Sequence, residues 1–278
     1  MAALEALILV FVAGLITDLA TGLGALPFFI WEEVSDRWIV GLWGIAGGIM
    51  LSASVFGLIW KGYLYAMAKA GFVTAFWKLG LGLLLGAVLV ELADKVIDQY
   101  DHEPEDMAEA NFKKLLLILG VLTVHSFPEG VAIGVSFANL GITSASFASV
   151  NILGFVVPLL AVFMTLAISI QNIPEGLAVS IPLKTYDYSK WDMVKYSIFS
   201  SVPQPIGAVL AYYFVTIAQQ ILVIGFGFAA GAMIFLVYDD LVPEGLEQGE
   251  DLPANGKKQM AAGLVTGFLV MIPLVFLI

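Results

Sequence analysis

The 278-residue sequence contains no cysteine, and this absence excludes several kinds of site at once. Disulfide bonds, iron–sulfur clusters and thiolate zinc sites all require cysteine side chains. Any metal site in this chain must therefore use histidine, methionine, carboxylate, amide or backbone ligands.

Basic residues are also scarce. Twelve lysines and arginines stand against 23 aspartates and glutamates, and the formal net charge is −11. The basic residues form no cluster that could follow a phosphate backbone, so we expect no nucleic-acid partner.

Long apolar runs, by contrast, fill most of the chain. Sixty per cent of the residues are hydrophobic, 13% are charged, and the mean hydropathy is +0.96. A membrane-spanning helix needs about 20 apolar residues, so about eight spans with short connections account for the whole length. The sequence predicts an all-α integral membrane protein in which residues 1–278 form a single polytopic domain, without room for a soluble catalytic domain.

The hydrophobic runs and the residues that interrupt them place these spans. The expected spans cover residues 4–30, 38–60, 72–93, 113–138, 152–182, 193–217, 220–243 and 259–277. The uncharged stretch from Leu140 to Asn151 precedes the fifth span, and we expect part of it to be interfacial or unwound. The N-terminal residues lack a positively charged start and a clear signal-peptidase site, which predicts a retained first helix.

The distribution of lysine and arginine predicts the orientation, because cytoplasmic connections retain basic residues. Lys61, Lys69 and Lys78 surround the second connection. All other basic residues flank the first, third, fifth and seventh connections: Arg37, Lys95, Lys113, Lys114, Lys184, Lys190, Lys195, Lys257 and Lys258. We therefore expect a multi-pass protein of the cytoplasmic membrane with both termini outside.

The third connection, residues 94–112, is the longest of those predicted to lie in the cytoplasm. It places His102 among seven carboxylates: Asp94, Asp98, Asp101, Glu103, Glu105, Asp106 and Glu109. The simpler interpretation is a solvated acidic loop, and the alternative is a loop that collects metal ions.

Two predicted spans carry similar motifs with ionisable side chains, which are costly in a bilayer and indicate function. The fourth span contains His125-Ser126-Phe127-Pro128-Glu129-Gly130, and the fifth contains Gln171-Asn172-Ile173-Pro174-Glu175-Gly176. In each motif a metal-binding side chain precedes a glutamate by four residues, so both lie on one helix face about a turn apart. The proline and glycine are expected to bend the helix there. Neither span has a central lysine or arginine to pair with the glutamate, which favours a metal site.

These paired motifs resemble the signatures of the ZIP (Zrt-, Irt-like) divalent-metal transporters of the prokaryotic type. The similarity extends over Ala20 to Pro27, Ala46 to Leu51, Gly231 to Met233 and Asp239 to Glu244. The resemblance implies eight helices with both termini outside, as the lysine distribution also predicts. It further implies a transport bundle (spans one, four, five and six) that slides as an elevator against a scaffold (spans two, three, seven and eight).

Carried over residue by residue, the resemblance implies a primary metal site made of His125, Glu129, Gln171, Asn172 and Glu175, with Met50 as a soft ligand. Imidazole and thioether ligands favour Zn²⁺, Cd²⁺ or Fe²⁺ over Mg²⁺ and Ca²⁺. The carboxylates compensate the charge of the dication. The weakly binding amides suit a carrier that must release its ion.

Many bacterial members of this family have a residue pattern that implies a binuclear metal site. This chain departs from that pattern at three positions. Ser126 replaces an asparagine, Asn172 an aspartate and Gln204 a glutamate. Two carboxylates are thus amides, so we predict one high-affinity metal. Coordination of a second metal by Gln204 as a neutral ligand is the alternative.

Four more acidic residues lie in or beside the spans. Asp239, Asp240 and Glu244 form either a helix-end cluster facing water or a metal exit station. Asp18 lies well inside the first span and is expected either to line an aqueous path or to be protonated.

These features together predict a transporter that moves a divalent transition metal into the cytoplasm by alternating access. Zinc is the first candidate, followed by cadmium, iron, manganese and cobalt, and a metal-gated channel is the alternative. We expect no catalytic cofactor and no enzymatic activity, because an intramembrane zinc protease needs a His-Glu-x-x-His motif that the sequence lacks.

The expected partners are the metal ion, the lipid bilayer and a second copy of the chain. Gly80, Gly82 and Gly86 in the third span would permit close approach between helices of a homodimer. The same glycines would equally serve to pack spans within one chain.

Overall fold

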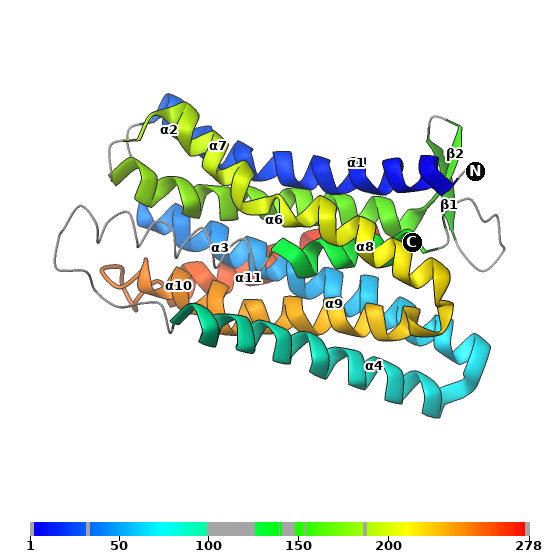
Figure 1. Cartoon of the computed structure of the whole chain (residues 1–278). Helices are drawn as coiled ribbons and strands as arrows, with labels where there is room; N and C mark the ends of the chain where they lie inside the picture. Colours follow the sequence, from blue (N-terminus) through cyan, green and yellow to red (C-terminus); the bar gives the residue numbers. More distant parts are fainter. Residues whose placement is uncertain are drawn as a thin grey trace.

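The structure is a computed structural model that describes residues 3–31, 34–98, 126–138, 140, 148–152, 154–185 and 188–275. Its helices lie side by side along one direction (Figure 1), as the predicted all-α membrane fold requires. The described residues contain five helical stretches that are long and apolar enough to cross a membrane: Leu4–Ile30, Asp36–Ala93, Leu159–Lys184, Lys190–Ile217 and Leu222–Glu247. Helix α11 (Lys257–Val275) and the helical residues 126–136 lie where the eighth and fourth spans are predicted.

Apolar side chains cover the outside of the bundle. Large hydrophobic residues are exposed along α1 (Ala3–Thr21) and α4 (Lys61–Asp98), among them Leu4, Ile16 and Trp77. A soluble protein would hide such faces, whereas lipid accommodates them. Exposure and composition therefore agree that these helices face hydrocarbon.

The polar interior is confined to one group of helices. Apart from Ser52 and Ser54, every buried polar side chain among the described residues belongs to five segments. These are α1, the helical residues 126–136, α6 (Leu159–Thr185), α7 (Lys190–Ser201) and α8 (Pro203–Ile217). α1 packs against both α6 and α8.

The remaining long helices pack as two apolar pairs. α3 (Asp36–Ser52) lies along α11, and α4 lies along α9 (Leu222–Leu236). A Cβ atom at Gly82 or Gly86 would collide with carbonyl oxygens of α9, so these two glycines serve packing within the chain. The two groups contain the spans that the resemblance assigns to bundle and scaffold. Their relative motion, like the total of eight spans, stays a prediction.

The second and third predicted spans form one continuous stretch through α3, the π-helical η2 (Ala53–Trp60) and α4. The chain reverses inside α4 at Gly71, whose φ of 81° and ψ of 176° suit glycine alone. In Figure 1 this bend lies at the same end of the bundle as the start of α1 and the end of α11. The second connection thus lies at the same end as both termini, as predicted. That this end faces the outside of the cell stays a prediction.

Two predicted boundaries are wrong. The fifth span begins at Leu159 rather than 152, because β1 (Ser149–Ile152) and β2 (Phe155–Pro158) form an antiparallel hairpin. Gly154 turns the chain at a φ of 86°, and its N–H donates to Asn151 Oδ1 at 3.0 Å. β-branched residues on both strands favour this pairing over a helix.

The second wrong boundary is the start of the acidic connection. α4 continues to Asp98, so the first residues of the predicted 94–112 loop are helical. The rest of that loop, with His102, lies outside the described residues.

Candidate metal site

Helix α6 carries three of the predicted site residues, Gln171, Asn172 and Glu175, and buries all of them. The residues stay helical through Pro174, and the predicted bend at this motif stays a prediction. Its glycine serves close packing, because a Cβ at Gly176 would collide with the carbonyl oxygen of Thr21 on α1.

The glycine of the other motif has the same role. A Cβ at Gly130 would collide with the carbonyl oxygen of Gln204 on α8. The two glycines thus bring α1 and α8 against the helices that carry the glutamates, and four segments meet around them.

Glu129 accepts hydrogen bonds from two amide groups. Only 1% of the residue is exposed. Gln171 Nε2 donates to its Oε1 at 2.7 Å, and Gln204 Nε2 donates to its Oε2. Both carboxylate oxygens therefore receive an N–H donor, one from α6 and one from α8.

Asn172 connects these amides to α1. Its Nδ2 donates to the carbonyl oxygen of Thr17 at 2.8 Å and to Gln204 Oε1 at 3.0 Å. Gln204 consequently uses both ends of its amide, the oxygen towards Asn172 and the nitrogen towards Glu129. At two positions where the family pattern has acids, this chain has a neutral hydrogen-bonded pair.

Three oxygens on α6 accept no hydrogen bond from the part of the chain that the structure describes: Gln171 Oε1, Asn172 Oδ1 and Glu175 Oε1. Buried acceptors without donors are costly, and their presence calls for an explanation. Glu175 also lies close enough to Glu129 for the two carboxyl groups to interact electrostatically. Amide and carboxylate oxygens gathered in this way suit a cation.

The other predicted ligands are placed less directly. His125 lies outside the described residues. Met50 is buried on α3, which packs against α6, and its role as a ligand stays a prediction. Within the described ranges no three His, Cys, Asp or Glu side chains converge into a metal cluster. The amides at positions 172 and 204 are one reason.

Ser126 and Asp18 are both buried. Ser126 Oγ donates to the carbonyl oxygen of Ser200 at 3.2 Å, which ties the helical residues 126–136 to α7. Asp18 Oδ1 accepts no hydrogen bond from any described residue. A role for Asp18 in an aqueous path stays a prediction.

The three acids beyond α9 lie on the π-helical η4 (Val237–Leu241) and on α10 (Val242–Glu247). Asp239 and Glu244 are exposed, and Asp240 is partly buried. Glu244 nevertheless interacts electrostatically with Glu175 of the buried site. Part of the cluster is therefore exposed and part lies within electrostatic range of Glu175, and its role as a helix-end cluster facing water or as a metal exit station stays a prediction.

Sequence reasoning missed the part that α1 plays. The Thr17 carbonyl accepts from Asn172, and Thr21 Oγ1 donates to Ser201 Oγ at 2.8 Å. The available signal was a pair of threonines one turn apart beside Asp18 in an otherwise apolar span, which marks a polar face directed inward.

Comparison with known proteins agrees with this architecture. Residues 99–274 match the family model described as ZIP Zinc transporter. A putative zinc transporter of Arabidopsis thaliana is 35% identical over 230 residues, covering 82% of this chain but 33% of that protein, so the chain spans only a third of its length. Zinc transporter ZIP11 of Bos taurus is 29% identical, covering 91% of this chain and 92% of its own. Zinc transporter ZupT of Chlorobaculum parvum is 28% identical over 96% of both chains.

The fold and the buried oxygen cluster define a multi-pass membrane protein with a polar interior. With the family match, which covers more than half of its length, the chain belongs to the ZIP zinc transporter family.

Proposed function

We propose that this protein transports divalent transition-metal cations, zinc foremost, across the cytoplasmic membrane into the cell. The observation that carries the proposal is the trio of buried oxygens on α6 that accept no hydrogen bond from the described residues. Together with Glu129 they supply carboxylate and amide ligands, and His125 and Met50 add the nitrogen and sulfur that favour zinc, cadmium or iron. Manganese and cobalt are further candidate substrates.

One metal ion occupies the site in this proposal. A second ion would share Glu129 and Glu175 with the first and would need further oxygen ligands. Asn172 and Gln204 direct their amide groups at each other and at Glu129 instead. Binding by Gln204 would first have to break those hydrogen bonds.

Alternating access by an elevator-like motion fits the division of the helices. α1, the helical residues 126–136, α6, α7 and α8 form the moving bundle and carry the site. The α3–α11 and α4–α9 pairs form the scaffold. Asp18 lines the path inside the bundle, and Asp239, Asp240 and Glu244 receive the ion at the cytoplasmic end.

In this proposal the protein is a carrier and not an enzyme, and it needs no catalytic cofactor. Its termini lie outside, residues 1–278 act as one polytopic domain, and the working form is a homodimer. The relatives named zinc transporters support the substrate class.

Metal uptake into proteoliposomes loaded with a divalent-sensitive dye tests the proposal. The wild-type protein should take up Zn²⁺ and Cd²⁺ but not Mg²⁺, and Glu175→Ala should abolish uptake while leaving the protein folded. Uptake that saturates and exchanges across the membrane supports a carrier, whereas a non-saturating current supports a metal-gated channel. No uptake of any metal by a folded, reconstituted protein would refute transport.

A further inference from the structure

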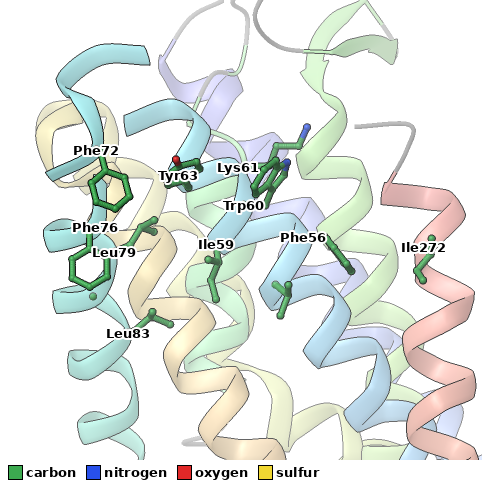
Figure 2. A pocket seen from close by; sticks show the side chains of 12 residues that line it. Phe56, Ile59, Trp60, Lys61, Tyr63, Phe72, Phe76, Leu79, Leu83 and Ile272 are labelled. Atoms are coloured by element: carbon green, nitrogen blue, oxygen red, sulfur yellow. The ribbon is translucent and has the colours of Figure 1, made fainter. Parts of the chain in front are cut away.

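A pocket of about 830 Å³ opens on the side of the bundle, between η2, α4 and α11. None of its lining residues belongs to the candidate metal site. The wall is almost entirely aromatic or aliphatic, as Figure 2 shows for Phe56, Ile59, Phe76, Leu79 and Leu83. The rim residue Phe76 is largely exposed, so the pocket opens towards the surrounding hydrocarbon.

One end of the pocket is polar. Lys61 and Tyr63 lie there, beside Trp60, and Leu83 marks the opposite end (Figure 2). Trp60 is 51% exposed. Tryptophan, tyrosine and lysine at the end of an apolar span are typical of the membrane–water interface. The pocket thus has a single cationic group at interface depth and an apolar wall leading away from it.

The segment that forms most of the pocket carries basic residues and no acidic ones, although the whole chain is acidic. Lys61 opens α4, Lys69 lies on the same segment before the bend, and Lys78 follows the bend. Neither aspartate nor glutamate occurs from Trp38 to Val90, which includes η2 and most of α4. An anion at Lys61 therefore meets no repulsion from these two elements.

We propose that this pocket binds an anionic phospholipid of the bilayer. One acyl chain lies along the aromatic and aliphatic wall, and the phosphate group lies at Lys61. The charge complementarity selects an anionic headgroup over a zwitterionic one, because one lysine at a membrane surface favours an anionic lipid by about fivefold. The shape alone would accept any acyl chain.

Native mass spectrometry of the purified full chain tests this binding. The protein is released from vesicles that contain equal amounts of phosphatidylglycerol and phosphatidylcholine, and the retained lipids are counted. The wild-type chain should retain phosphatidylglycerol about fivefold over phosphatidylcholine. Lys61→Gln should retain a lipid but lose the preference. Equal retention of both lipids by the wild-type chain would overturn the proposal.

A second variant fills the pocket without disturbing the fold. Gly80 lines the pocket, and a Cβ placed there meets no atom within 4 Å. Gly80→Phe should therefore remove the bound lipid. Gly41→Phe is the matched control, since Gly41 lies outside the pocket on α3 and its Cβ also meets nothing within 4 Å.

The same spectra distinguish a lipid from a second copy of the chain. Retention of lipid by Gly80→Phe at the wild-type level would refute the pocket as its site. A shift from dimer to monomer in Gly80→Phe, with unchanged lipid content, would mean that a second copy covers the pocket and would likewise refute the proposal.

Discussion

The two glutamates of the repeated motif have different surroundings. Both oxygens of Glu129 accept amide hydrogens, whereas Glu175 Oε1 accepts none from the described residues. Glu129 is therefore oriented by its neighbours, and in the proposed site Glu175 Oε1 is the oxygen that binds the metal ion. Equal motifs in the sequence do not imply equal roles in the site.

Gln204→Glu should convert this site towards a binuclear one. The substitution removes the N–H donor that Gln204 gives Glu129 and adds a carboxylate beside it. Two adjacent carboxylates attract a further dication, so bound zinc should rise from one ion per chain to two. Metal analysis of purified protein after equilibration with zinc measures this ratio.

Gln204→Met, which has similar length and adds no charge, is the control for that measurement and should stay at one ion. An unchanged ratio of one in Gln204→Glu would show that the amides are not what limits the site to one metal.

Uptake should weaken as the pH falls. Protons compete with the metal for the lone pairs of Glu129, Glu175 and His125, so the apparent KM should rise several-fold between about pH 7.5 and about pH 5.5. The maximal rate should change less. Dye-loaded proteoliposomes measured over this range at several zinc concentrations separate the two parameters. An apparent KM independent of pH would contradict competition at the ligands.

At the level of elements, small residues decide which helices meet. Gly176 lets α1 approach α6, and Gly130 lets α8 approach the helical residues 126–136. The glycines that follow the two glutamates are thus packing residues, and they position the α1 carbonyl and the α8 amide at the site.

Gly176→Ala should destabilise the protein by about 1–3 kcal/mol, because the new methyl group collides with the Thr21 carbonyl and forces α1 away. Gly41→Ala, whose methyl group meets open space, should have almost no effect. Thermal unfolding in detergent compares the two variants. Equal midpoints would show that α1 does not pack against α6 as closely as described.

At the scale of the whole molecule, the two groups of helices meet where η2 and α3 contact α6. A Cβ at Gly57 of η2 would lie 3.0 Å from the sulfur of Met164 on α6. An elevator-like motion must change contacts along this surface, whereas contacts inside the scaffold should persist.

Cross-linking tests this motion cleanly, because the chain has no cysteine of its own. The double variant Gly57→Cys, Met164→Cys should transport zinc when reduced and lose most uptake after treatment with a short thiol cross-linker. The control pair is Gly47→Cys, Val237→Cys, which joins α3 to η4 within the scaffold, where the Cβ of residue 47 lies 3.2 Å from Val237. Its cross-linked form should keep its activity. Full activity of the cross-linked Gly57 pair would contradict sliding at this surface.

Much of the fold follows from local sequence properties. Apolar runs of bilayer length predict the spans, and the four-residue spacing of Gln171 and Glu175 predicts a shared helix face, because both depend only on helix geometry. The hairpin at 149–158 was missed because its residues are as apolar as a span. Only the pairing of the two strands distinguishes this hairpin from a membrane-spanning helix.

The sequence by itself determined that this is a membrane protein of the ZIP zinc transporter family. It also predicted that the chemistry lies in two motifs. Tertiary structure alone decided that Asn172 and Gln204 bond to each other, that Gln204 and Gln171 orient Glu129, and that a lysine-capped pocket opens beside α4. The physical reason is the sequence separation over which each effect acts. Helix periodicity acts over four residues, whereas these contacts join side chains up to 75 residues apart, and only packing brings them together.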